Sequence, residues 1–345
     1  MASSLSTQTT FDCMPRSSLF ATIVFLAFTH NSAPASADVI NFSWDNDLFL
    51  GSDQGYTNGG RISYLNTPSE GPERESSGFA AAVRDHLAFL PGIDDESNQH
   101  ATSFSLRQLI VTPKNISNPE PQYDDLPYAG YLSLSSSLWS WRADQITGAG
   151  LHLGVVGPES GAEATQKWVH KVTGSERPRG WEYQLGTDVV GGVQAIHGRK
   201  LLQLGSKGEV EQQVSAIGSA MLSTFQTSVQ TGLIWRIGHN LPMNFAPDYA
   251  GSSTSIALPG SFSNTESSWS VFIGAGVEYT PYSYIEEHAA PYRFDNDPII
   301  SQIGVGGTWQ WNNLQAALTL RTTTGAGDQH KDNFSFGTLS LSWTL

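Results

Sequence analysis

One segment of the chain combines a histidine with a glutamine at helical spacing. The string GPESGAEATQKWVHKVTG runs from Gly157 to Gly174, with glutamates near its start and lysines near its end, the order that a helix dipole favours. We therefore predict a helix from about 159 to 173, in which Gln166 and His170 share one face. A histidine held in this way can act as a general base, with the amide orienting the ring or a nearby water. The same spacing also occurs on ordinary solvent-exposed helix faces, so both interpretations stay open at this point.

A second group of oxygen-bearing side chains begins at Asp45, Asn46 and Asp47 and continues in YTNGGR from Tyr56 to Arg61. Carboxylate and amide oxygens close together are the ligands that a hard cation such as Ca²⁺ prefers. Asp, Asn and Gly are also common where strands reverse, so turn chemistry explains the string equally well. Neighbours in a strand point to opposite faces, and Asn46 and Asp47 can share a site only at a strand end or a bulge.

Other motifs that carry chemistry are missing from the sequence. There is no H-E-x-x-H, no P-loop and no dinucleotide-binding fingerprint. Ser160 has the wrong offset for a nucleophile elbow. The proline and glycine of DDLPYAGY (124–131) are best explained by the backbone geometry of a loop that enters a strand.

The elements around these residues alternate with a period of two. From Trp269 to Tyr279 the odd positions are mostly large and apolar while the even ones, apart from Phe272, are small or polar, and the run from Leu339 to Leu345 has a similar alternation. Such alternation over ten or more residues is typical of the strands of a transmembrane β-barrel. About twelve segments follow it: 38–50, 56–66, 101–112, 128–142, 147–156, 182–203, 210–222, 224–238, 265–280, 297–311, 313–325 and 333–345.

We therefore predict an all-β fold, a transmembrane antiparallel β-barrel of about 12 strands with one short helix in an extracellular loop. An even strand count places both termini on the periplasmic side. The long connections 67–100 and 239–264 are expected to be extracellular loops. A secreted β-sandwich is the alternative fold, and no apolar stretch reaches the length of a membrane-spanning helix.

The N-terminal segment has the features of an export signal. Arg16 precedes the apolar run 19–28, and an Ala-Ser-Ala site ends at Ala37. We predict cleavage there, which divides the chain into a signal peptide (1–37) and an outer-membrane barrel domain (38–345). The one cysteine, Cys13, lies in the removed part, so the mature chain has no disulfide and no catalytic thiol.

Charge excludes one class of function. The 345 residues carry 32 acidic and 18 basic side chains, a formal net charge of −14, and no basic patch stands out. A protein that binds nucleic acid normally shows such a patch, so this class is set aside.

Four strings together resemble one family. WDNDLF (44–49), YTNGGRISY (56–64), DDLPYAGYL (124–132) and GPESGAEATQKWVHKVTGSERPRGWEYQL (157–185) are similar to the lipid A 3′-O-deacylases of the LpxR type, calcium-dependent lipases of the Gram-negative outer membrane. The resemblance extends from about residue 39 to the C-terminus. It implies a twelve-stranded barrel with its active site between the outer barrel wall and a helix from an extracellular loop.

The resemblance also implies roles for individual residues. The family's catalytic histidine and glutamine match His170 and Gln166, its asparagine–aspartate pair matches Asn46 and Asp47, and its hairpin threonine matches Thr57. A basic residue that binds lipid in one branch has no clear counterpart. Lys114, shifted in position, is the only lysine in 113–127 and is our candidate for substrate binding.

The hypothesis that follows is ester hydrolysis. Neutral His170 takes a proton from a water that attacks the ester carbonyl of an acyl chain, and Gln166 orients the ring or the water. Ca²⁺ held near Asn46 and Asp47 polarises the carbonyl. Thr57 donates to the oxyanion or positions the lipid.

We expect lipid A or lipopolysaccharide as the substrate, the outer membrane as the location, no nucleic-acid partner and a monomer. Two alternatives remain at this stage. An outer-membrane phospholipase would use similar machinery, and a porin or structural barrel would have no catalytic role.

Overall fold

The computed structural model describes residues 38–46, 55–66, 85–95, 97–206, 208–241, 267–294, 297–324 and 334–345, without the side chains of 55–58 and 334. All of these residues belong to one compact unit, Ala37–Leu345. The expected signal peptide lies outside the described residues.

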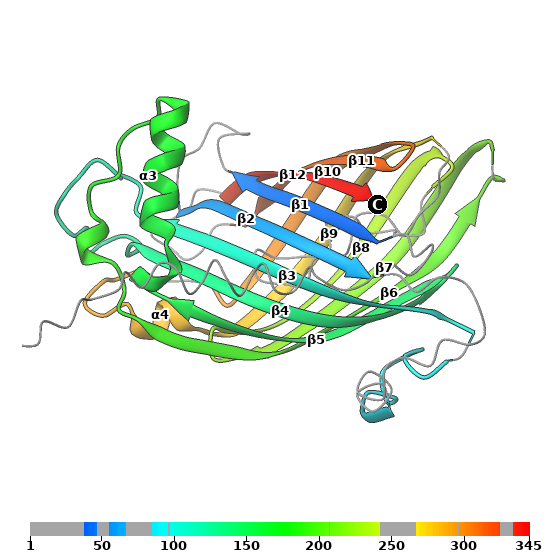
Figure 1. Ribbon diagram of the computed structural model, residues 1–345, viewed down its shortest axis with the longest axis horizontal. Coiled ribbons are helices and arrows are strands. Elements are labelled where there is room, and N and C mark those ends of the chain that lie inside the picture. The colour runs from blue at the N-terminus through cyan, green and yellow to red at the C-terminus, as the bar shows by residue number, and fades with distance from the viewer. Residues whose placement is uncertain are drawn as a thin grey trace, which may run out of the picture. The chain divides into compact units, whose positions relative to one another are not determined.

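Twelve antiparallel strands close into a barrel, in which each strand pairs with its neighbours in sequence and β1 pairs with β12 (Figure 1). The predicted fold class is therefore confirmed. The strands are β1 (Val39–Asn46), β2 (Gly55–Asn66), β3 (Gln99–Thr112), β4 (Ala129–Arg142), β5 (Gln145–Val156), β6 (Asp188–Leu204), β7 (Val210–Ser223), β8 (Gln226–His239), β9 (Ser268–Ser283), β10 (Ile299–Trp311), β11 (Leu314–Thr323) and β12 (Phe334–Thr344).

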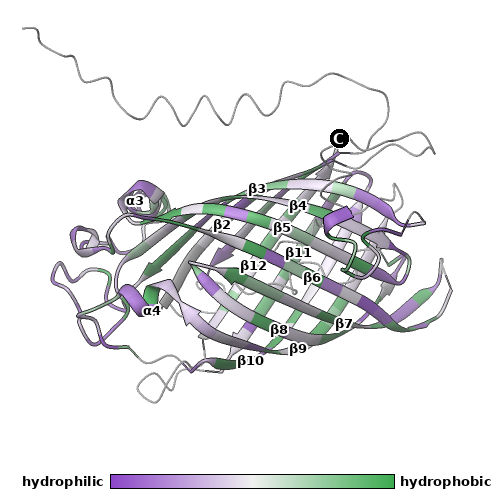
Figure 2. Cartoon of the chain, turned by 90° about the horizontal axis from the view of Figure 1, so that it is seen from below, coloured by the Kyte–Doolittle hydropathy of each residue, from purple (hydrophilic) through white to green (hydrophobic). Residues whose placement is uncertain are grey.

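Alternation along the strands separates an apolar outer face from an interior that holds many polar side chains together with buried apolar clusters, and both kinds of residue follow one another along the ribbons of Figure 2. On β9, Trp269, Val271 and Ile273 are exposed on the outside. Inside, the amide of Asn41 donates to Ser340 Oγ at 2.8 Å. This inverted arrangement suits a barrel whose outside meets lipid. Among the described residues, no helix is both long and apolar enough to cross a membrane.

The expected helix is present but begins later than predicted. Pro158–Ser160 forms a separate 3-10 turn, and α3 spans Ala162–Thr173. Gly161 between them has φ of 70°, a left-handed conformation that interrupts the α-helical path. Gly174 ends the helix as predicted, with φ of 74° and its N–H donating to the His170 carbonyl.

The structure adds a helix that was not predicted. α4 (Tyr284–His288) follows β9 directly, so the expectation of one short helix was incomplete. The segment is too short for a helical hydrophobic period to be visible in the sequence. Both α3 and α4 lie at the end of the barrel opposite the C-terminus (Figure 1).

The location of the two long connections was predicted incorrectly. Leu345 donates its N–H to the Asp38 carbonyl, so both ends of the barrel chain meet at one rim, which we call the terminal end. Each odd strand leads away from this rim and each even strand returns to it. The connections that follow β2 and β8 therefore start and finish at the terminal end, opposite α3, where the periplasm lies in such barrels.

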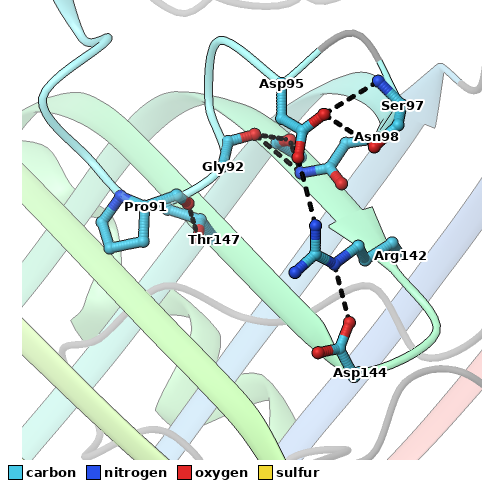
Figure 3. A network of polar contacts seen from close by, with 9 residues as sticks. Pro91, Gly92, Asp95, Ser97, Asn98, Arg142, Asp144 and Thr147 are labelled. Carbon is cyan, nitrogen blue, oxygen red and sulfur yellow. Dashed lines mark hydrogen bonds and ion pairs between the residues drawn. The ribbon is translucent and has the colours of Figure 1, made fainter.

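Residues 91–95, 97 and 98 of the β2–β3 connection are packed against β4 and β5 at the terminal end (Figure 3). The Gly92 carbonyl accepts from Ser140 Oγ and from the Asn98 amide. Arg142 lies between two carboxylates, at 3.1 Å from Asp95 and 2.7 Å from Asp144. These polar contacts hold the segment against the barrel wall.

Candidate functional site on the outer wall

The helix α3 stands on the outside of the barrel. Along β3, Arg107 and Leu109 are buried in the interior, so Leu106, Gln108 and Ile110 face outward. Leu106 is indeed exposed, whereas Ile110 is only 2% exposed because it is covered from outside. The cover is a buried cluster that Ile110 forms with Tyr128, Ala162 and Trp181.

Close backbone approach at β4 brings the start of α3 to the wall. A Cβ added at Gly130 would lie 2.1 Å from Ser160 Oγ and 2.4 Å from Ala162 Cβ, so only glycine allows this contact. Next to it, the amide of Gln108 donates to the Ser160 carbonyl at 2.7 Å. The 3-10 turn and the first turn of α3 are thereby fixed to β3 and β4.

Asn46 lies on the same outer wall as the base of α3. It is four residues after the exposed Phe42 on the same strand, so both side chains point to the outer face, yet Asn46 is only 3% exposed. It pairs with Asn58, which in turn pairs with Ile110. Asn46 is thus two strand spacings from the cluster beneath α3, about 10 Å along the sheet.

The other residues of this group are described only in part. Asn46 is the last residue of β1 that the structure describes. Asp47 itself lies outside the described residues. Thr57 occupies the register shift between Tyr56 and Asn58, a bulge that changes the direction of side chains. The side chain of Thr57 is not among those described.

His170 lies in the last turn of α3 and is partly buried. Its Nδ1 is hydrogen-bonded to the backbone carbonyl of Glu176, beyond the end of the helix. A carbonyl oxygen can only accept, so Nδ1 must carry the proton. In the neutral ring the lone pair is then on Nε2, the nitrogen that can accept a proton.

Gln166 is 0% exposed, one turn before His170. Its Oε1 accepts a hydrogen bond of 2.7 Å from the indole of Trp181. Its Nε2 is buried and has no hydrogen-bond partner among the residues that the structure describes. Among the described residues, the amide of Gln166 is hydrogen-bonded to Trp181 and not to His170, so the expected contact between amide and imidazole is not formed there.

Lys114 is exposed just after the end of β3. Its backbone N–H donates to Asp125 Oδ2 at 2.8 Å, which secures this loop to the residues before β4. The same loop contacts the segment after α3, where Arg179 N–H donates to the Ile116 carbonyl at 2.9 Å. The surroundings are acidic, since the charges of Glu182 and Glu120 raise the pKa of Tyr183.

A row of apolar side chains crosses the outer wall between the candidate residues and the terminal end of the barrel. Phe42 pairs with Ile62, Ile62 with Leu106, and Leu106 with Leu134. All four side chains point outward and are exposed, from 36% for Leu106 to 57% for Leu134. The candidate residues therefore lie where a lipid-facing surface gives way to a polar one.

The described residues do not by themselves form a metal site. No group of three or more His, Cys, Asp and Glu side chains among them could hold a metal ion. Asn46 contributes an amide oxygen, a ligand type that Ca²⁺ accepts, and Asp47 next to it would add a carboxylate. The chemistry of this pair fits a hard cation.

Trp181 is the residue that sequence reasoning missed. It belongs to the short 3-10 turn Trp181–Tyr183, where a strand from residue 182 was predicted. β6 in fact begins at Asp188. The string RGWEY contained a weak signal, because Trp is highly buried on average even where its neighbours are polar, but its partner could not be read from the sequence.

Comparison with known proteins adds an independent line of evidence. The model of a family described as outer membrane protein LpxR matches residues 18–345. No curated protein matches the chain by sequence.

A solved structure shares this fold, and two others have lower similarity to it. LpxR from Salmonella typhimurium has a TM-score of 0.71 at 17% identity, covering 89% of this chain and 100% of that one. The β domain of the Bordetella autotransporter BrkA has a TM-score of 0.41 at 10% identity, covering 90% and 99% of the two chains. The translocator domain of the autotransporter NalP from Neisseria meningitidis has a TM-score of 0.37 at 10% identity, covering 95% of each chain. Of these, the first shares the whole fold.

Proposed function

This chain belongs to the LpxR family of outer membrane proteins, and from that premise we propose that it hydrolyses the ester of a 3′-linked acyl or acyloxyacyl chain of lipid A, with His170 as the base. Location in the outer membrane and the class of lipid A deacylases follow from membership of the family. The bond cleaved, the base and the dependence on Ca²⁺ are the content of the proposal.

The hydrogen bond between His170 and the Glu176 carbonyl is the observation that carries it. It holds the ring in one orientation and keeps the proton on Nδ1. Nε2 can then take a proton from a water as that water attacks the ester carbonyl, and can return it to the departing alkoxide. No serine or cysteine nucleophile is required.

The position of the site on the wall supports a lipid ester as the substrate. The exposed row from Phe42 to Leu134 offers acyl chains an apolar surface. The buried polar residues Asn46 and Gln166 lie beyond it, toward the helix. An ester at the junction of sugar and acyl chain would meet this boundary when the lipid approaches sideways from the membrane.

Asn46 and Asp47 would hold Ca²⁺, which when bound would polarise the ester carbonyl. Thr57 would donate to the developing oxyanion or position the lipid, and Lys114 would attract a phosphate of the head group. Gln166 would present its amide N–H groups to the reacting atoms.

Mass spectrometry of lipid A tests this function. Cells that produce the protein should show lipid A lighter by one acyl or acyloxyacyl group, and His170→Asn should restore the full mass while the barrel still folds. Unchanged lipid A with the wild-type protein would reject the substrate. Release of fatty acid from phospholipids instead would identify a phospholipase, and retained activity in His170→Asn would reject the base.

A further inference from the structure

The amide of Gln166 has a fixed orientation in a fully buried place. An indole N–H can only donate, so the amide atom that faces Trp181 at 2.7 Å must be oxygen. The Nε2 group then points the other way, and it is buried with no hydrogen-bond partner among the described residues. A buried donor left without a partner is costly, which indicates that it serves a ligand.

We propose that Trp181 is a positioning residue for the deacylation: its indole N–H holds Gln166 so that the amide Nε2 faces the reacting ester or the attacking water. This role rests on the proposed function. With Trp181 in place, reversing the amide would set its NH₂ group against the indole N–H, donor against donor. One orientation is thereby selected before any substrate arrives.

Trp181 is itself held from two sides, so it can impose this orientation. Its ring packs on Tyr128 with centroids 4.9 Å apart at 54°. Tyr128 donates through its hydroxyl to the Ile116 carbonyl at 2.9 Å. Gly180, the residue before Trp181, also lies close to the Tyr128 ring, because a Cβ at Gly180 would be 2.5 Å from that ring.

The chemical benefit is a donor that does not need to reorient. Attack on the ester places negative charge on the carbonyl oxygen, and donors already aimed at that oxygen stabilise the transition state. If the attacking water is the partner instead, the same N–H fixes its position beside His170. In either case Gln166 touches the reacting atoms and Trp181 acts only through Gln166.

The test compares kcat and KM for lipid A hydrolysis by the purified full-length protein and its variants. Trp181→Phe removes the indole N–H and keeps an aromatic ring. We expect kcat to fall about 5- to 10-fold, the effect of one lost hydrogen bond, with KM little changed. Trp139→Phe is the matched control, because Trp139 is equally buried at 1% exposure and donates to Ser103 Oγ at 2.8 Å inside the barrel. It should retain wild-type kcat.

A double-mutant cycle separates positioning from general support of the fold. Gln166→Ala should lower kcat about 100-fold. In the Gln166→Ala background, Trp181→Phe should cause no further loss of kcat. If Trp181 only supported the fold, it would lower kcat in that background as well. Gln166→Glu supplies a second test, since the carboxylate still accepts from Trp181 but offers no N–H, and its kcat should fall as in Gln166→Ala.

Each outcome leads to a decision. An inactive wild-type protein would overturn the proposed function and this role with it. An active wild type with an equally active Trp181→Phe variant, or additive losses in the cycle, would overturn the role of Trp181 alone. If Trp181→Phe does not fold, as judged by heat-modifiable migration on gels, a fully active Gln166→Glu variant would overturn the inference.

Discussion

At the scale of single residues, the site depends on groups that can only donate or only accept. The Glu176 carbonyl determines which nitrogen of His170 carries the proton. The Trp181 indole determines that the amide oxygen of Gln166 faces Trp181 and the amide nitrogen points away from it. Neither assignment depends on seeing a hydrogen atom, because each partner has a single possible role. The groups proposed to react are therefore oriented before any substrate binds.

Lys114 provides a prediction about substrate binding. Lys114→Ala should raise KM for lipid A about 2- to 5-fold and leave kcat unchanged, since an exposed ion pair with a phosphate contributes little more. Lys200→Ala is a suitable control, because Lys200 N–H bonds to the Asp144 carbonyl at the opposite end of the barrel. An unchanged KM in Lys114→Ala would exclude Lys114 from head-group binding.

Sequence reasoning reached some of these residues and not others. His170 and Gln166 share a helix, so their spacing alone placed them on one face. Trp181 could not be found in this way, because its contact with Gln166 spans 15 residues and depends on how the chain turns after Gly174. Contacts between separate local structures leave no periodic pattern.

At the scale of elements, the attachment of α3 to the wall is the feature that places the site. The helix makes its closest contact at Gly130, beside the amide of Gln108. The helix itself was predictable from its string. Its location on the outer face of β3 and β4 was expected only from the family resemblance.

Gly130→Ala should displace the start of α3 and reduce activity by about 10-fold or more, since small errors of position in a catalytic site have large effects. The barrel should still form, as heat-modifiable migration would show. Gly218→Ala is the matched control, because a Cβ there would make only an ordinary contact of 3.6 Å. Wild-type activity in Gly130→Ala would mean that this contact does not place the site.

The segment of residues 91–98 should respond to acid. Hydrogen bonds from Ser97 and the charge of Arg142 lower the pKa of Asp95. This stabilisation is fully present above the unfolded value of about 3.9 and is lost as pH falls through the lower folded value. Hydrogen exchange of the segment, corrected for the intrinsic rate, should increase below about pH 4.

Asp95→Asn should produce the same increase at neutral pH, and Asp85→Asn serves as the control. The effect should be small, because Asp95 is exposed to solvent and screened. Equal protection in Asp95→Asn and the wild type would show that Asp95 does not hold the segment.

At the scale of the whole molecule, the sheet closes on itself through the pairing of β1 with β12 and has polar contacts of its own inside the barrel. Hydrogen bonds between polar side chains fill the interior, as between Arg236 and Gln213 at 2.8 Å. We therefore expect EGTA to abolish deacylation and added Ca²⁺ to restore it, while heat-modifiable migration stays unchanged. Full activity in EGTA would refute the calcium hypothesis, and loss of the folded band would assign the metal a structural role.

The architecture was largely predictable because strict alternation marks each strand. The even count and the closed barrel followed from that pattern. Loop length, however, was a poor guide to the side of the membrane. The order of strands is the reliable guide, since each connection must lie at the end where its two strands meet. By this rule both long connections belong at the terminal end.

The attachment of α3 outside the wall has a kinetic consequence. A catalyst that meets its substrate only along the plane of a bilayer responds to the number of target molecules per unit of surface, not per litre. Spreading the same quantity of lipid A through inert amphiphile should therefore slow turnover, although the amount in the tube is constant.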